Sequence, residues 1–383
     1  MHRPLHRAVS AALSAAALGG TAVALIVSGA AAADPPTAGL AGDNPAAKPD
    51  PPLTSFASVP LSTSGGTIQA VIYDGANTTT GGSLPLALTG FTVPASPFTA
   101  QTTAVVADGQ ISGNTFSFAG SGPALTDPAA FPGTGPCPGG WSFGCLWDTR
   151  NYDVASTLVA GDASANATVA STAGDCVTWV AQVFATGPSA AFVNAGYVAA
   201  GVGLRDQGSA AITIAGIPAG AYIARAYLYW ANINPTDPGG AMLIDGHSTT
   251  SQLDGTDLSP CWPAPGSPWN VFAYSANVTP FVTGNGTYTL SGYPTGLTGG
   301  QDPWANNDAN PLMEGASLVV FYGQMTSTGT AVGATEGALF SGQVATFTEP
   351  DASALASQYA ATIDWGDTGT SSGTVAGPPG GPF

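Results

Sequence analysis

The sequence has few charged side chains, and most of those it has are acidic. Only 8% of its 383 residues are charged, against roughly 25% in ordinary soluble domains. Lys and Arg together number 6, whereas Asp and Glu number 23, which gives a formal net charge of −17. A chain of this kind has no basic patch to neutralise phosphates. We therefore expect that it does not bind nucleic acid.

The sequence has one long apolar, uncharged run that could cross a membrane, at its N-terminus, and lacks a second long apolar segment. Arg3 and Arg7 precede an Ala-, Gly- and Ser-rich stretch, 8–33, that ends in three alanines. This pattern is typical of a secretory signal peptide. We predict cleavage near Ala33 and a secreted, extracellular protein without a membrane span. The alternative is an uncleaved anchor, because the run is long enough to cross a bilayer.

Cysteines are also few, and the four that occur predict disulfides. An even number of cysteines in an exported chain favours a disulfide framework. We predict that Cys137 pairs with Cys145 across a Pro- and Gly-rich loop, and that Cys176 pairs with Cys261. A zinc site is the alternative, but the sequence has no CxxC spacing, and His247 is the one histidine that remains after signal cleavage.

The sequence has no long amphipathic helical pattern, and its short apolar runs predict an all-β fold. With 52 Gly and 32 Pro, these runs are separated by turn residues. The stretch 67–73 alternates as a strand that we expect to turn at Asp74-Gly75. A second Asp-Gly turn is expected at Asp245-Gly246. The apolar run 176–186 is typical of a strand buried on both faces.

The order of these runs predicts one or two β-sandwich, jelly-roll-like units and an incomplete third module. The predicted organisation comprises a signal peptide (1–33), a Pro- and Ala-rich linker (34–52), two β-sandwich units (53–205 and 206–326) and a partial repeat (330–383). The stretch "DVASTLVAG" from Asp153 is similar to "NVTPFVTG" from Asn277. Either the two units are related, or one local solution occurs twice.

Two stretches resemble known families. The segment from Ala334, with "YAATIDWGD" from Tyr359, resembles the PKD-type, Ig-like repeats of bacterial surface proteins. It departs from their Trp-Gly-Asp-Gly signature at Thr368 and lacks their later strands, so we expect a truncated repeat. The block with "AYLYWANI", "ANVTPFVTGNGTYTLSG" and "GASLVVFYG", about 206–326, resembles an uncharacterised β-sandwich domain of exported actinobacterial proteins. Its middle stretch is also similar to jelly-roll carbohydrate-binding modules.

The sequence offers no catalytic constellation, and we predict no catalytic residue. His247 follows the Asp245-Gly246 turn and reads as a surface turn residue. Hydrolysis by paired carboxylates would need two acids on one cleft. Candidates for such a pair occur in the second unit: Asp245, Asp254, Asp257 and Glu314. As isolated acids they are ordinary turn or surface residues.

One polar cluster predicts a calcium site. Calcium binds carboxylate, amide and carbonyl oxygens, and one loop and its surroundings offer several of them. The candidate ligands are Asp302, Asn306, Asp308, Asn310 and Glu314. The spacing is not that of an EF-hand, and an Asn-rich turn bonded to its own backbone is the alternative.

Tryptophans near loops could stack on sugars or close the ends of a sandwich. Trp179 and Trp230 lie in apolar strands and are expected in the core. The other five considered lie in or beside loops: Trp141, Trp147, Trp262, Trp269 and Trp304. We predict a non-catalytic extracellular structural or adhesive protein whose partner is a protein or polysaccharide. The alternatives are a carbohydrate-binding module and a secreted hydrolase with paired carboxylates.

Overall fold

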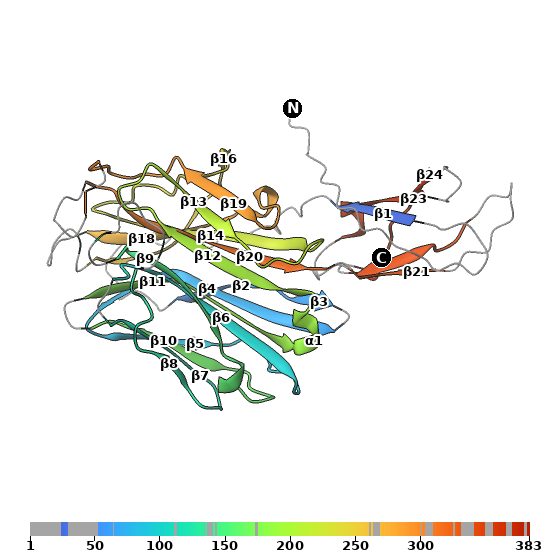
Figure 1. Ribbon diagram of the computed structural model, residues 1–383, viewed down its shortest axis with the longest axis horizontal. Coiled ribbons are helices and arrows are strands. Elements are labelled where there is room, and N and C mark those ends of the chain that lie inside the picture. The colour runs from blue at the N-terminus through green and yellow to red at the C-terminus, as the bar shows by residue number, and fades with distance from the viewer. Residues whose placement is uncertain are drawn as a thin grey trace.

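The computed structural model describes most of the chain from residue 53 onward (Figure 1). The described residues are 24–29, 53–63, 65–110, 113–133, 135, 141, 144–172, 175–259, 262, 269–299, 301–302, 309–324, 326–330, 341–348, 355–364, 370–378 and 381–383. Over these residues the fold is all-β, which confirms the predicted class. The helices within the described residues are α1 (Ser189–Phe192) and the 3-10 turns η1 (Ala155–Thr157), η2 (Thr279–Phe281) and η4 (Ala356–Gln358). Among the described residues, no helix has the length and apolar character needed to cross a membrane.

The first sandwich consists of two antiparallel sheets. Its large sheet has the order β2-β4-β11-β6-β9, with β3 also paired to β4, and its small sheet has the order β5-β10-β7-β8. The strands of the large sheet are β2 (Thr54–Ser58), β3 (Leu61–Thr63), β4 (Gly66–Thr80), β6 (Phe98–Ala107), β9 (Trp147–Asp153) and β11 (Cys176–Pro188). Those of the small sheet are β5 (Ser83–Leu88), β7 (Thr115–Ala119), β8 (Leu125–Asp127) and β10 (Ala165–Ala170).

The second sandwich begins with β12, ahead of the predicted boundary at 205/206. Its large sheet has the order β12-β20-β14-β18-β17, and its small sheet has the order β13-β19-β15-β16. The large-sheet strands are β12 (Ala195–Gly203), β14 (Tyr222–Asn234), β17 (Gln252–Leu258), β18 (Asn270–Asn277) and β20 (Leu312–Gly323). The small-sheet strands are β13 (Ser209–Ile214), β15 (Leu243–Ile244), β16 (His247–Ser248) and β19 (Gly286–Ser291). The predicted Asp245-Gly246 turn joins β15 to β16.

The two sandwiches follow one building plan. The order β4-β11-β6-β9 in the first corresponds to β12-β20-β14-β18 in the second, and the small sheets correspond strand for strand. The similar stretches at Asp153 and Asn277 occupy equivalent places. In each, the first side chain accepts a bond from the backbone N–H two residues on, at 3.0 Å, and a 3-10 turn follows. The short similarity therefore marks two related units, and β2, β3 and β17 are additions to the common plan.

The large sheets of the two sandwiches lie face to face, so the body has four layers, visible from bottom to top in Figure 1. Strand alternation divides the side chains between cores. In β4, Ile68, Ala70 and Ile72 face the central core between the sandwiches, whereas Val71 and Tyr73 face the core of the first sandwich. The apolar run 176–186 forms β11, which is buried on both faces as predicted. Burial on this scale joins the sandwiches into one unit.

The expected turn at Asp74-Gly75 is wrong, because β4 continues through these residues to Thr80. The register against β11 shifts between Trp179 and Ala181, so the strand is irregular here rather than reversed. Gly75 has φ +148, which suits glycine. An Asp-Gly pair therefore marks a turn at residue 245 and an irregular strand here. Pairing on both sides of β4 decides the difference.

The C-terminal strands lie beside the four-layer body, at the right in Figure 1. One pair joins β21 (Thr326–Gly329) to β22 (Ala345–Thr348), and a separate sheet has the order β1-β23-β24. Its strands are β1 (Ala24–Gly29), β23 (Tyr359–Asp364) and β24 (Thr370–Gly373). Phe383 packs on Phe347 and Tyr359 and exchanges two backbone bonds with Phe347. The residues after Asp364 in the "TIDWGD" motif lie outside the described residues, and membership in the PKD-type repeats stays a prediction.

Candidate functional site

A groove lies where the outer strands of the two large sheets meet, β9 of the first sandwich and β12 of the second. We call this place the open seam. The groove has a volume of about 430 Å³, within the range of ligand sites. Its lining comes from β6, β9, β12 and the residue after β13: Thr99, Ala100, Gln101, Thr102, Thr103, Asn151, Tyr152, Asp153, Tyr197, Val198, Ala199 and Ala215.

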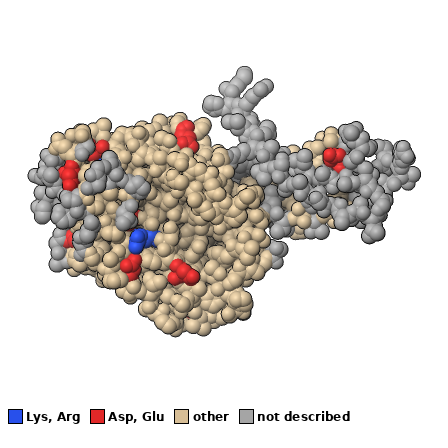
Figure 2. Space-filling model, in the orientation of Figure 1, with Lys and Arg blue, Asp and Glu red and all other residues tan. Residues whose placement is uncertain are grey.

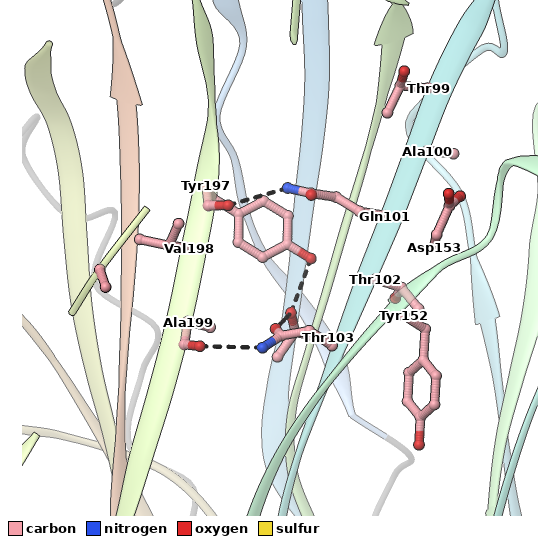
Figure 3. A pocket seen from close by; sticks show the side chains of 12 residues that line it. Thr99, Ala100, Gln101, Thr102, Thr103, Tyr152, Asp153, Tyr197, Val198 and Ala199 are labelled. Carbon is pink, nitrogen blue, oxygen red and sulfur yellow. Dashed lines mark hydrogen bonds between the residues drawn. The ribbon is translucent and has the colours of Figure 1, made fainter. Parts of the chain in front are cut away.

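Side chains of the first sandwich bond to the edge of the second across this groove (Figure 3). Gln101 donates from Nε2 to the carbonyl oxygen of Tyr197 at 3.2 Å, and Asn151 donates from Nδ2 to that of Ala199 at 3.2 Å. The Tyr197 hydroxyl lies 3.0 Å from Oγ1 of Thr103, which also donates to Oδ1 of Asn151 at 2.6 Å. These bonds fix the buried ring of Tyr197 as the floor of the groove.

The groove is nearly uncharged. Of its lining residues, Asp153 alone carries a charge, and it is exposed at the end of β9. The face drawn in Figure 2 is mostly free of charged side chains, with scattered acidic patches. Hydroxyl and amide groups of the lining can donate and accept hydrogen bonds. The groove therefore suits a neutral ligand rich in hydrogen-bonding groups.

The opposite edge of the same interface is filled, and we call it the closed seam. Here β2 pairs with the outer edge of β4, and β17 pairs with the outer edge of β18. Strand β17 packs on β4: Gly255 lies against the backbone of Gly75 and Ala76, where no side chain would fit. Asp257 of β17 accepts the backbone N–H of Thr78 in β4 at 2.7 Å. The closed seam therefore has little room beside its strands.

Two acids face each other inside the closed seam. Asp74 continues the series Ile68, Ala70 and Ile72 on the face of β4 that looks toward the second sandwich. Asp254 accepts the Ser275 hydroxyl at 2.9 Å, and Ser275 pairs in register with Tyr229, whose ring belongs to the central core. One carboxylate oxygen of each acid and the Tyr229 hydroxyl are buried without a hydrogen-bond partner.

The pKa values of both acids are raised above their usual range. Burial raises the pKa of Asp74 to about 7, although its own backbone N–H lowers it in part. Burial raises the pKa of Asp254 well above its usual value, and the charge of Asp74 raises it further. No basic side chain acts on either pKa. Asp254 was a candidate for a hydrolytic pair, but its neighbour Asp74 could not be foreseen, and neither lines the groove.

The predicted calcium ligands are only partly described. Asn306 and Asp308 lie outside the described residues, whereas Asp302 and Asn310 lie in the segment before β20. Glu314 lies inside β20, fully buried, and forms an ion pair with Arg205, whose guanidinium sits 4.6 Å from the ring centre of Trp262. No group of three or more His, Cys, Asp or Glu side chains suited to a metal occurs among the described residues. The calcium site stays a prediction.

The predicted disulfides also stay predictions. Cys145 lies in the segment before β9 and Cys176 begins β11, whereas Cys137 and Cys261 lie outside the described residues. Among the described cysteines there is no free thiol.

Most tryptophans within the described residues are buried and are not available for stacking on a sugar. Trp179 and Trp230 are buried as expected. Trp141, Trp147 and Trp262 are buried as well, and Trp147 begins β9 rather than lying in a loop. His247 is exposed and stacks on Phe281 with the ring centres 4.9 Å apart, as befits a surface turn residue. Trp304 lies outside the described residues. None of these described rings lines the groove.

Comparisons with known proteins give no family. No protein family and no curated protein matches the chain. Among solved structures, PNGF-II in space group P21 aligns with 8% identity and a TM-score of 0.22, over 70% of this chain and 66% of that one. The CBM22-1–CBM22-2 tandem domain of Paenibacillus barcinonensis Xyn10C aligns with 11% identity and a TM-score of 0.19, over 73% of this chain and 100% of that one. Similarities this weak carry no functional argument.

Proposed function

We propose that this is an exported, non-catalytic protein with a structural or adhesive role, and that the open seam holds its ligand. The groove between β9 and β12 carries the proposal, because it is a formed, nearly uncharged recess on a body whose two large sheets share one central core. Sites of this kind form preferentially where two domains meet. The neutral lining favours binding over chemistry, since Asp153 is its one acid.

The carbohydrate-binding alternative rests on the same groove. Gln101, Asn151 and Thr99 present amides and hydroxyls that match the hydroxyl groups of a sugar. The ring of Tyr152 does not add a stacking surface, because it packs on Phe116 in the core of the first sandwich. The hydrolase alternative lacks such support, because the carboxylate pair Asp74–Asp254 lies in the closed seam, away from the groove lining.

Retention on immobilised polymers tests the proposal. The probes are cellulose, xylan, chitin and peptidoglycan, with gelatin and casein as extended proteins. The variant Ala215→Trp places a large ring in the groove from an exposed position, and Ala211→Trp is the matched control on the exposed face of β13. We expect retention of the native protein and of the control, and its loss in Ala215→Trp. Retention on no polymer, or polymer cleavage, would contradict the proposal.

A further inference from the structure

We propose that the open seam is a docking site for an extended peptide strand of a partner protein, which adds to the outer edge of β12. The inference rests on the proposed function and names the chemistry of the partner. It is carried by the duplication of the two sandwiches, by the hydrogen-bonding groups on the β12 edge, and by the shape and charge of the groove.

The duplication shows what the open seam lacks. In the common plan β12 corresponds to β4, and β9 corresponds to β18. In the closed seam both outer edges are covered, since β2 pairs with β4 and β17 pairs with β18. In the open seam the described residues place no strand on the outer edge of either β9 or β12. The two seams are therefore equivalent in the common plan, but at the closed seam both sheet edges carry an added strand, whereas at the open seam a groove lies beside them.

The outer edge of β12, with which no described strand pairs, presents alternating backbone groups. The carbonyl oxygens of Tyr197 and Ala199 point away from β20, because they accept bonds from Gln101 and Asn151 across the seam. In an antiparallel ladder the N–H of a residue points to the same side as its carbonyl. Residues 197 and 199 therefore offer two donors and two acceptors at the two-residue spacing that an added strand requires.

The side-chain amides of Gln101 and Asn151 donate to the carbonyl oxygens that the backbone N–H groups of an added strand would otherwise reach. Gln101 is half-buried and Asn151 is exposed, so the amide donor of either can turn to solvent. If Asn151 turns away, the buried hydroxyl of Thr103 loses the Asn151 acceptor and keeps the Tyr197 hydroxyl as its partner. An incoming strand would exchange its own N–H groups for these amides. The number of hydrogen bonds is then conserved, and burial of the partner's side chains supplies the net gain.

The groove also defines the character of the strand. Val198, Ala199 and Ala215 give it small apolar contacts, and Tyr197 forms the floor. Asp153 is its single charge. A strand with small or apolar side chains fits this lining, and a basic residue would be favoured near Asp153. A strongly acidic segment would be repelled by a chain with a net charge of −17.

Peptide binding tests the proposal on the full chain. The probes are an array of heptapeptides and a fluorescent peptide with the sequence of residues 53–59, LTSFASV, which contains the strand that fills the position equivalent to the β12 edge. The variant Ala199→Pro removes an N–H that points into the seam while leaving the ladder to β20 intact. Ala199→Ser keeps that N–H and is the control.

We expect array peptides to bind the native protein and Ala199→Ser alike, and to bind Ala199→Pro about tenfold more weakly, the loss for one good hydrogen bond. Hydrogen exchange at the Tyr197 and Ala199 amides should slow when peptide is bound. A second test needs no protein variant. In an added strand every second peptide N–H points toward β12, so N-methylation of that set of amides should abolish binding, whereas N-methylation of the other set should not.

Three results would overturn the inference. If no peptide binds the native protein more tightly than Ala199→Pro, and peptides methylated at either set of alternate amides bind equally, then no strand is added to β12. If a polysaccharide is retained equally by native and Ala199→Pro, and lost in Ala215→Trp, the groove binds sugar instead. In that second case the proposed function stands while the strand inference fails. Absence of both peptide and polymer binding would contradict both.

Discussion

At the scale of single residues, the contact between Trp147 and Gly315 shows how tightly the two sandwiches fit. Trp147 begins β9 of the first sandwich, and Gly315 lies in β20 of the second. A methyl group at residue 315 would overlap the indole ring. The indole Nε1 donates to the Ser317 hydroxyl at 2.9 Å, so the ring is fixed in position. A glycine is needed here for close approach rather than for an unusual backbone angle.

We predict that Gly315→Ala destabilises the protein by about 1–3 kcal/mol, because the indole has no space into which it could move. Urea unfolding followed by tryptophan fluorescence measures the change in the free energy of unfolding. Gly208→Ala is the control, because its added methyl would meet only the tip of Leu297, 4.0 Å away. Equal stability of the two variants would show that the interface is loosely packed at Trp147.

At the scale of elements, β17 fastens the second sandwich to the first. Its residue Asp257 accepts the N–H of Thr78, which lies in the part of β4 beyond the end of β2. That carboxylate also accepts the N–H of Leu258 at 2.8 Å. A side chain of one sandwich thus takes the place of a missing strand partner in the other.

We predict that Asp257→Ala lowers the free energy of unfolding by about 1–3 kcal/mol, because the Thr78 N–H then lacks a protein acceptor. Asp257→Asn keeps an acceptor oxygen, so its loss should be smaller. Hydrogen exchange at the Thr78 amide is the direct measurement. Exchange that is no faster in Asp257→Ala than in Asp257→Asn would show that the bond contributes nothing.

Elements were the level at which sequence patterns predicted the structure best. The apolar run 176–186 predicted β11, and the Asp245-Gly246 pair predicted the turn between β15 and β16. The short match between Asp153 and Asn277 marked two equivalent turns. The same logic failed at Asp74-Gly75, since β11 pairs along β4 and overrides the local turn signal. The local sequence shows which conformations a segment favours, and pairing with distant strands decides between alternatives of similar energy, such as a turn and a continued strand.

The sites were beyond reach of such patterns because they form between distant segments. The groove combines residues near 100, 151 and 198, and Asp74 meets Asp254 only through the packing of two sheets. Asp254 could be named as a candidate acid, but no sequence feature identified its neighbour. Side chains that face a central core from two separate sandwiches leave no common spacing in the chain.

At the scale of the whole molecule, the buried pair Asp74 and Asp254 makes the packing of the two sandwiches against each other sensitive to pH. Asp74 belongs to the first sandwich, whereas Asp254, Tyr229 and Ser275 belong to the second. With no basic side chain acting on either acid, a shared proton is the available neutraliser at their unpartnered oxygens. The titratable groups that face the pair are therefore Asp74, Asp254 and Tyr229, and all three lose a proton at higher pH.

The sign of the pH dependence follows from the raised pKa of Asp74, about 7 in the folded protein against 3.8 ordinarily. Between these values the folded protein holds a proton that the unfolded chain has released. The contribution is therefore fully present below about pH 4 and is lost as the pH rises through 7. For Asp74 alone the loss amounts to about 4 kcal/mol.

We predict that Asp74→Asn, which is neutral at every pH, removes this part of the pH dependence. Relative to the native protein, the variant should gain free energy of unfolding from pH 4 to pH 8, measured by urea titration at each pH. Parallel profiles would show that the pair holds no proton. Repeating the titration at pH 8 with calcium tests whether a cation, rather than a shared proton, neutralises the two acids. A bound cation would stabilise the native protein and not Asp74→Asn, whereas a shared proton would leave the stability of both unchanged by calcium.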